Sequence, residues 1–94
     1  MEVKSKDQIR VVIVPGNGCG NVRSCNWYAY AAEKLESTGL FKEVLLEDMP
    51  DPMLAREAIW LPFLINECGV GSNTIIIGHS SGAGTLNSHV NSSN

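Results

Sequence analysis

A glycine–serine turn directly after an apolar run constrains the fold more than any other part of this sequence. Residues 78–82 read Gly-His-Ser-Ser-Gly and follow the run Thr74-Ile75-Ile76-Ile77, whose β-branched residues favour a buried strand. The pattern G-x-S-x-G is typical of a serine held on a sharp turn between a strand and a helix. An ordinary glycine-rich turn is the alternative, because two glycines and a serine recur by chance. We predict that Ser80 is a nucleophile, in an elbow formed with Gly78, His79 and Gly82.

Length and composition limit the chain to one small domain without nucleic-acid or metal-binding features. The 94 residues are 44% hydrophobic with a net charge of −3, a profile without the basic face that nucleic acid requires. The three cysteines have spacings that match neither a zinc motif nor a disulfide framework, which indicates free thiols in a reducing compartment. We expect no metal and no other cofactor.

The sequence contains no segment typical of a membrane or secreted protein. No apolar stretch approaches the roughly 20 residues of a transmembrane helix, and the N-terminus lacks the long apolar region of a signal peptide. We therefore expect no membrane partner and a cytoplasmic location, with the nucleus as a second compartment.

A second glycine-rich segment follows the first predicted strand. The continuous apolar run of residues 9–14 is stopped by Pro15-Gly16, which indicates a strand buried on both faces of a parallel sheet. The loop that follows, residues 16–21, is not a dinucleotide-binding loop, because Asn21 stands where the third glycine of G-x-G-x-x-G would be. Its backbone N–H groups can point at a reacting group instead. A flexible surface loop remains the alternative.

Two helices and a further strand are predicted between these motifs. Residues 27–38 form a helix that buries Trp27, Ala31 and Leu35 and ends at Gly39. Residues 41–46 form a short strand.

The second helix is expected to begin after Asp51, with this residue as N-cap and Pro52 at the first helical position. Its buried face is predicted to contain Leu54, Ala58, Leu61 and Ile65. Pro62 is expected to kink or interrupt it.

The element order is therefore β-α-β-α-β, followed by an attempted helix. Right-handed crossovers place helices on both faces of a three-stranded parallel sheet, in a three-layer α/β/α arrangement with strand order 2-1-3. The glycine loop and the Ser80 elbow then emerge side by side at the carboxyl ends of the strands. We expect Ser80 to attack a carbonyl while the N–H of Ser81 and an N–H of Asn17 or Gly18 hold the oxyanion.

Several motifs together resemble a known family. They are Val12-Ile13-Val14-Pro15-Gly16-Asn17-Gly18, Trp27-Tyr28, Asp48-Met49-Pro50-Asp51-Pro52, Ala55-Arg56-Glu57, Trp60-Leu61-Pro62-Phe63 and the segment 74–83. This set resembles the retinoblastoma-binding protein 9 family of serine hydrolases, which have the α/β-hydrolase fold. The resemblance implies a metal-independent intracellular hydrolase of small ester or amide substrates, with Ser80 as nucleophile and the Asn17 region in the oxyanion hole. We expect Trp27 and Trp60 to line the substrate pocket. A position in the hydrophobic core is the alternative for Trp60.

The chain departs from the family pattern in its partner-binding stretch. The family binds the retinoblastoma protein through a Leu-x-Cys-x-Glu stretch before the nucleophile strand, and residues 68–72 here read Cys-Gly-Val-Gly-Ser. A retinoblastoma-type partner is therefore not expected to bind by this route.

The catalytic triad is also incomplete in this chain. In this fold an acidic residue and then a histidine follow the serine, but no acidic residue follows Ser80, and His89 alone supplies a histidine beyond the elbow. A helix would carry His89 about 13 Å from Ser80. His79 is expected to pack beside the nucleophile rather than act as its base.

The resemblance stops after Ala83, which predicts the N-terminal part of an α/β-hydrolase fold. We expect a flexible lead-in over 1–8, a partial domain over 9–83 and a divergent, disordered tail over 84–94, as in a truncated chain that is inactive alone. A non-catalytic binding module or an unstable truncated isoform is the alternative.

Overall fold

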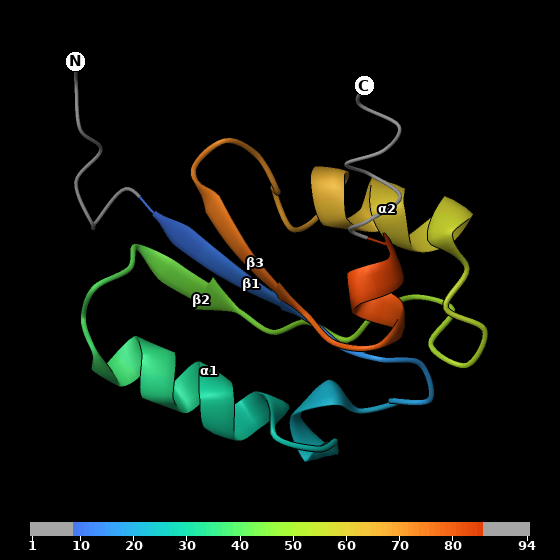
Figure 1. The fold of residues 1–94 in the computed structure, drawn as a ribbon, viewed down its shortest axis with the longest axis horizontal. Helices are drawn as coiled ribbons and strands as arrows, with labels where there is room; N and C mark the ends of the chain where they lie inside the picture. Colours follow the sequence, from blue (N-terminus) through green and yellow to red (C-terminus); the bar gives the residue numbers. More distant parts are fainter. Residues whose placement is uncertain (1–8, 86–94) are drawn as a thin grey trace.

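The protein, in a computed structural model that describes residues 9–85, contains a three-stranded parallel sheet with helices on both faces (Figure 1). The central strand β1 (Arg10–Val14) lies between β2 (Glu43–Leu45) and β3 (Thr74–Gly78). Both pairings are parallel. The predicted three-layer arrangement and the strand order 2-1-3 are therefore confirmed.

The central strand forms because its sequence is apolar on both faces. Val11, Val12, Ile13 and Val14 are almost fully buried, as a parallel strand between two helical layers requires. Alternate side chains point to opposite faces, so Val12 and Val14 pack on the α2 side while Ile13 packs on the α1 side. The sheet thus separates two small cores.

The first core lies under α1 (Tyr28–Ser37) and the short 3-10 helix η2 (Val22–Ser24). Tyr28 and Ala32 are its fully buried helical residues. Of the predicted buried face, Ala31 and Leu35 are half-buried and pack against this core, whereas Trp27 does not. Trp27 is the N-cap, with non-helical backbone angles, so its side chain does not follow the buried face of the helix and is 39% exposed.

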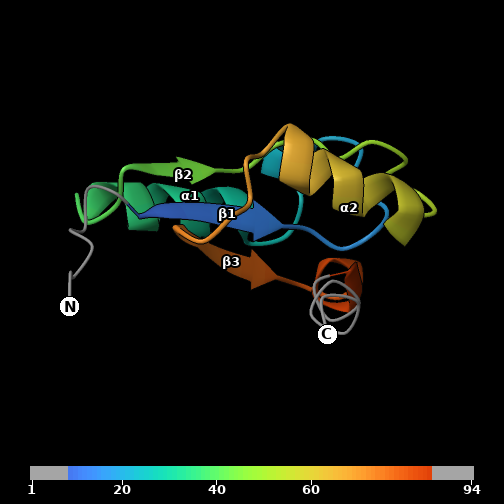
Figure 2. The same cartoon turned by 90° about the horizontal axis from the view of Figure 1, so that it is seen from above.

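The second core lies under α2 (Glu57–Asn66), on the opposite face of the sheet (Figure 2). Its buried helical residues are Trp60 and Leu64. The predicted face was wrong, since Leu54 is 69% and Ile65 is 41% exposed.

The error arises from the start of the helix. Asp51 does not cap a helix beginning at Pro52. Its carboxylate instead accepts hydrogen bonds from the backbone N–H and guanidinium of Arg56, and the helix begins at Glu57. Pro62 lies inside α2 without interrupting it, because the helix continues to Asn66.

The last described residues, Ser81–Thr85, are helical. Thr85 is buried and its hydroxyl donates to the Ser81 carbonyl oxygen at 3.1 Å. Gly84 and Thr85 therefore belong to the folded part rather than to the predicted tail, because a buried side chain and a helical hydrogen bond hold Thr85 in place. The predicted lead-in over 1–8, the remainder of the tail and His89 lie outside the described residues. Among residues 9–85, no helix is long and apolar enough to cross a bilayer.

Candidate active site

The loop after β1 and the turn after β3 meet at one end of the sheet. The two strands are parallel neighbours, with Val14 opposite Gly78, so both segments leave the sheet at the same end (Figures 1 and 2). A Cβ atom added to Gly16 would lie 3.1 Å from the Ser80 Cβ and 3.6 Å from its Oγ. Gly16 and Ser80 are therefore in contact, and the predicted proximity of the two glycine-rich segments is present.

Ser80 occupies a strained turn between β3 and the helical residues 81–85. Its φ angle is 56°, a left-handed conformation that non-glycine residues rarely adopt and that is typical of strained functional positions. The His79 N–H continues the strand pairing by donating to the Val14 carbonyl oxygen at 3.0 Å. The Ser80 side chain is exposed. A strained φ angle and an exposed side chain after a strand are the features that a nucleophile elbow would require.

Gly82 allows the turn to pack against the end of β1. A Cβ atom added there would lie 2.5 Å from the Val14 carbonyl oxygen and 2.8 Å from that of Pro15. Such contacts with backbone atoms cannot be relieved by rotating a side chain. The second glycine of the motif is therefore required by close packing of the elbow on the central strand.

Two backbone N–H groups beside Ser80 have no acceptor within residues 9–85. They belong to Ser81 and Asn17, and the Ser81 hydroxyl donates to the Asn17 side-chain oxygen at 3.2 Å. Gly18 differs, because its N–H donates to the Pro52 carbonyl oxygen at 2.7 Å. Its predicted role as an oxyanion donor is therefore corrected: the N–H is already bonded to the chain itself.

A buried tyrosine joins the glycine loop to the elbow. The Tyr28 hydroxyl accepts the Gly16 N–H at 2.9 Å and lies 2.7 Å from His79 Nδ1. The His79 ring packs edge-on against Tyr28 and Trp27, with ring centroids 5.8 and 5.4 Å apart. His79 therefore packs against these two aromatic residues, next to Ser80 in the chain. No role was predicted for Tyr28; the one sequence feature that pointed to it is its position at the start of the helix that follows the glycine loop.

The two tryptophans predicted to wall a pocket lie in different environments. Trp27 contacts His79 and is partly exposed near the elbow. Trp60 has no exposed surface, and its indole N–H donates to the Pro50 carbonyl oxygen at 2.7 Å. The assignment of Trp60 to a pocket wall is corrected, because α2 turns this side chain into the core against Val12 and Val14.

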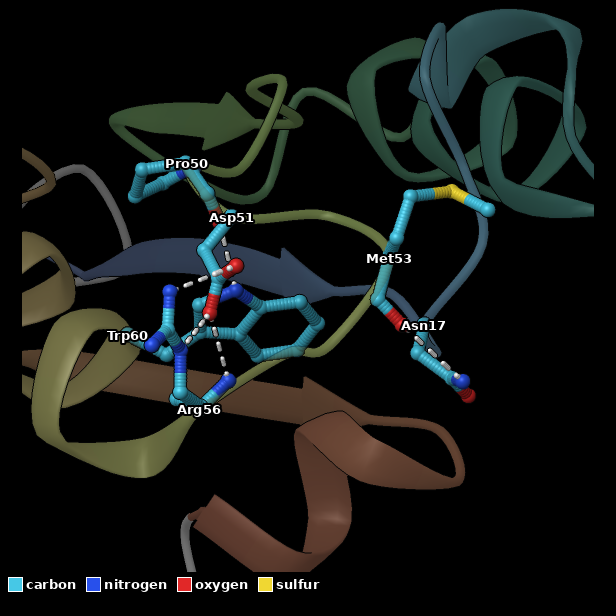
Figure 3. A network of polar contacts seen from close by, with 6 residues as sticks. All are labelled: Asn17, Pro50, Asp51, Met53, Arg56 and Trp60. Carbon is cyan, nitrogen blue, oxygen red and sulfur yellow. Dashed lines mark hydrogen bonds and ion pairs between the residues drawn. The ribbon is translucent and has the colours of Figure 1, made fainter.

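The turn before α2 contacts the glycine loop, residues 16–21, through Asn17 (Figure 3). The Asn17 side-chain amide faces the Met53 carbonyl oxygen at 3.5 Å, and the Arg56–Asp51 ion pair closes the turn with an N–O distance of 2.9 Å. The guanidinium and the backbone N–H of Arg56 lower the pKa of the Asp51 carboxyl group. Asp51 is thus committed to the turn and is not a triad acid.

The cysteines are free thiols, as the sequence predicts. Burial, with a smaller contribution from the neighbouring Cys25 thiol, raises the pKa of Cys19 to about 11. Burial also raises the pKa of Cys68. Neither thiol is activated as a nucleophile. Within the described part of the chain, no three potential metal ligands lie together.

Comparisons with known proteins identify a relative. No protein-family model matches the chain. The chain is 51% identical over 74 residues to the rat (Rattus norvegicus) protein named serine hydrolase RBBP9. The matched residues are 79% of this chain, and the chain spans about two fifths, 39%, of that relative. With a sheet of order 2-1-3 and an elbow at its end, it has part of an α/β-hydrolase fold. The sequence match to serine hydrolase RBBP9 over these 74 residues therefore confirms the resemblance predicted from the motifs.

Proposed function

We propose that this chain carries the nucleophile and the oxyanion hole of a serine hydrolase that acts on small ester or amide substrates. The contact between Gly16 and Ser80 supports this proposal most strongly. It places an exposed hydroxyl on a strained turn beside a loop that can offer N–H groups. Acyl transfer requires this combination, because an oxyanion forms as the hydroxyl attacks the carbonyl.

In the proposed reaction the Ser80 Oγ attacks the substrate carbonyl carbon. The Ser81 and Asn17 N–H groups, which have no acceptor within residues 9–85, donate to the developing oxyanion. The proton of Oγ passes to a base, which returns it to the leaving group as the C–O or C–N bond breaks, so that an alcohol or amine departs and Ser80 is acylated. Water then hydrolyses this ester and restores the Ser80 hydroxyl. The Ser81 and Asn17 side chains are hydrogen-bonded to each other. This bond does not use their backbone N–H groups, so it can persist when these groups donate to the oxyanion.

In this fold the serine is followed along the chain by an acidic residue and then by the histidine that acts as base. The given sequence does not show this order after Ser80. No acidic residue follows Ser80 and the one later histidine is His89, while His79 Nδ1 is occupied by Tyr28. Loss of the triad base typically lowers the rate by roughly 10⁴- to 10⁶-fold. We therefore expect slow acylation of Ser80 by this chain alone, accelerated by a base added to the solution.

Fluorophosphonate labelling of the full chain tests this function. Mass spectrometry should locate the adduct on Ser80, and free imidazole should increase the labelling rate because it supplies the absent base. Ser80→Ala should remove the adduct at every imidazole concentration. Ser24→Ala, which removes an exposed hydroxyl from η2, is the matched control and should label like the wild type. Labelling that survives Ser80→Ala would contradict the choice of nucleophile.

A binding module without chemistry is the second candidate. In this alternative the chain binds a partner and Ser80 does not react. A chain that unfolds cooperatively but does not label, even with imidazole, would support this function over hydrolysis.

The segment 68–72 does not enter either proposal as a docking motif. Cys68 is 2% exposed. The backbone carbonyl oxygens of Cys68 and Gly69 accept hydrogen bonds from the Arg10 guanidinium at 2.8 and 2.7 Å. We assign this segment a structural role, in which it holds the start of β3 against the start of β1.

A further inference from the structure

The contacts of Tyr28 differ from those expected of a core residue. Its side chain has no exposed surface and lies in the apolar cluster of Ile13, Val22 and Ala32. A phenylalanine would fill such a position, and a buried hydroxyl is costly unless it is hydrogen-bonded. The Tyr28 hydroxyl is bonded on both sides, to two segments that meet only at the candidate active site.

The direction of each bond follows from the groups involved. The Gly16 N–H can only donate, so the tyrosine oxygen accepts from it at 2.9 Å. The hydroxyl proton then needs an acceptor, which the His79 Nδ1 provides at 2.7 Å. A neutral imidazole with Nδ1 as acceptor carries its proton on Nε2. The chain Gly16–Tyr28–His79 therefore specifies one tautomer of His79.

The two partners of Tyr28 flank the proposed reaction centre. Gly16 precedes Asn17, whose N–H is a proposed oxyanion donor, and a Cβ at Gly16 would touch Ser80. His79 immediately precedes Ser80. The hydroxyl thus links the segment that holds the oxyanion donor to the segment that holds the nucleophile.

We infer that Tyr28 is a positioning residue, whose hydroxyl fixes the loop 16–18 relative to Ser80. This inference rests on the proposed function. Tyr28 does not touch the substrate. Its hydrogen bonds to the Gly16 N–H and to His79 Nδ1 set the distance between the Asn17 N–H and the Ser80 hydroxyl. An ångström-scale displacement of reacting groups can lower a rate by about 100-fold, so loss of this link should slow acylation without loss of the fold.

NMR measurements on the full chain test the link without requiring activity. In the wild type we expect His79 as the Nε2–H tautomer, a slowly exchanging Gly16 amide and an NOE from the Tyr28 hydroxyl proton to that amide. In Tyr28→Phe, Gly16 exchange should rise at least 10-fold while Val12 exchange is unchanged, and the His79 tautomers should no longer be fixed. Tyr30→Phe is the matched control, because it removes an exposed hydroxyl from the same helix.

The possible results separate this inference from the proposed function. The role of Tyr28 would be overturned if His79 in the wild type were the Nδ1–H tautomer. It would also be overturned if Tyr28→Phe left the exchange rate of the Gly16 amide unchanged. The wild-type tautomer and NOE decide the question even if Tyr28→Phe does not fold. With labelling as a readout, Tyr28→Phe should acylate at least 10-fold more slowly than Tyr30→Phe, and equal rates would also overturn it. A wild type that shows the NMR features but never labels contradicts the proposed function alone.

Discussion

Tyr28 and Trp60 occupy equivalent places on opposite faces of the sheet but have different roles. Both are large aromatic residues without exposed surface, and each lies in one of the two cores. The polar atom of Trp60 is bonded to the Pro50 carbonyl oxygen in the turn before α2, whereas that of Tyr28 is bonded to the loop and elbow at the candidate site. Burial alone therefore does not distinguish a structural aromatic residue from one that positions a site. The hydrogen-bond partners do.

This difference predicts that the two faces of the sheet respond differently to substitution. Changes on the α2 side should alter the free energy of unfolding and leave the chemistry of folded molecules unchanged. Changes at the elbow and on the α1 side should alter the reactivity of Ser80 as well.

Trp60→Ala should have the largest effect on stability. Truncation of a buried tryptophan typically costs about 3–5 kcal/mol, a large fraction of the stability of a small domain. Urea denaturation followed by circular dichroism would measure the loss. A cost below about 1 kcal/mol would show that Trp60 is not the centre of the α2 core.

Gly82→Ala should be the next largest change, because its new Cβ would meet the Val14 carbonyl oxygen at 2.5 Å. Overpacking of this kind costs about 1–3 kcal/mol. Gly84→Ala is a strong control, since it lies in the same helical segment with no atom within 4 Å of the added Cβ. Thermal denaturation should show a lower Tm for Gly82→Ala alone, and equal Tm values would contradict close packing of the elbow on β1.

Gly16→Ala should change reactivity more than stability. The added methyl group would lie 3.1 Å from the Ser80 Cβ, so the loop or the elbow must shift by a few tenths of an ångström. We expect about a 10-fold slower labelling of Ser80, because misplacement of reacting groups raises the barrier. Gly20→Ala, in the same loop but in open space, should label at the wild-type rate. If the two variants behave alike, the loop does not control the nucleophile.

Ala55→Gly should have the smallest effect and the opposite sign. Ala55 has a φ angle of 51°, which costs an L-residue more than it costs glycine. Relief of this strain should stabilise the chain by about 0.5–1 kcal/mol, offset in part by the loss of a methyl group packed on the α2 core. Labelling of Ser80 should not change. A destabilised variant would show that the contact outweighs the strain.

The sequence was sufficient to predict the elements with strong local patterns. The β-branched runs located β1 and β3. Right-handed crossovers predicted helices on both faces of the sheet, and a central position for β1 then predicted that the glycine loop lies beside Ser80. Helix α2 was more difficult, because Asp51 before Pro52 has the appearance of an N-cap. The true start at Glu57 depends on a tertiary feature, a turn held by the Asp51–Arg56 ion pair.

The finer parts of the site depend on contacts between segments far apart in the chain. The Gly18 N–H is occupied by a hydrogen bond to the carbonyl oxygen of Pro52, 34 residues later in the numbering. Tyr28 joins the site through partners in both glycine-rich segments. No local pattern encodes such pairings, so the sequence could predict Ser80 as the nucleophile but not the contacts of Gly18 and Tyr28.

The contact between the loop after β1 and Ser80 can be observed in a NOESY spectrum of the full chain. We expect cross-peaks between the Gly16 Hα protons and the Ser80 Hβ protons, because a Cβ at Gly16 would lie 3.1 Å from the Ser80 Cβ. Folded protein in which Gly16 shows NOEs to Tyr28 but none to Ser80 would show that the loop and Ser80 are not in contact.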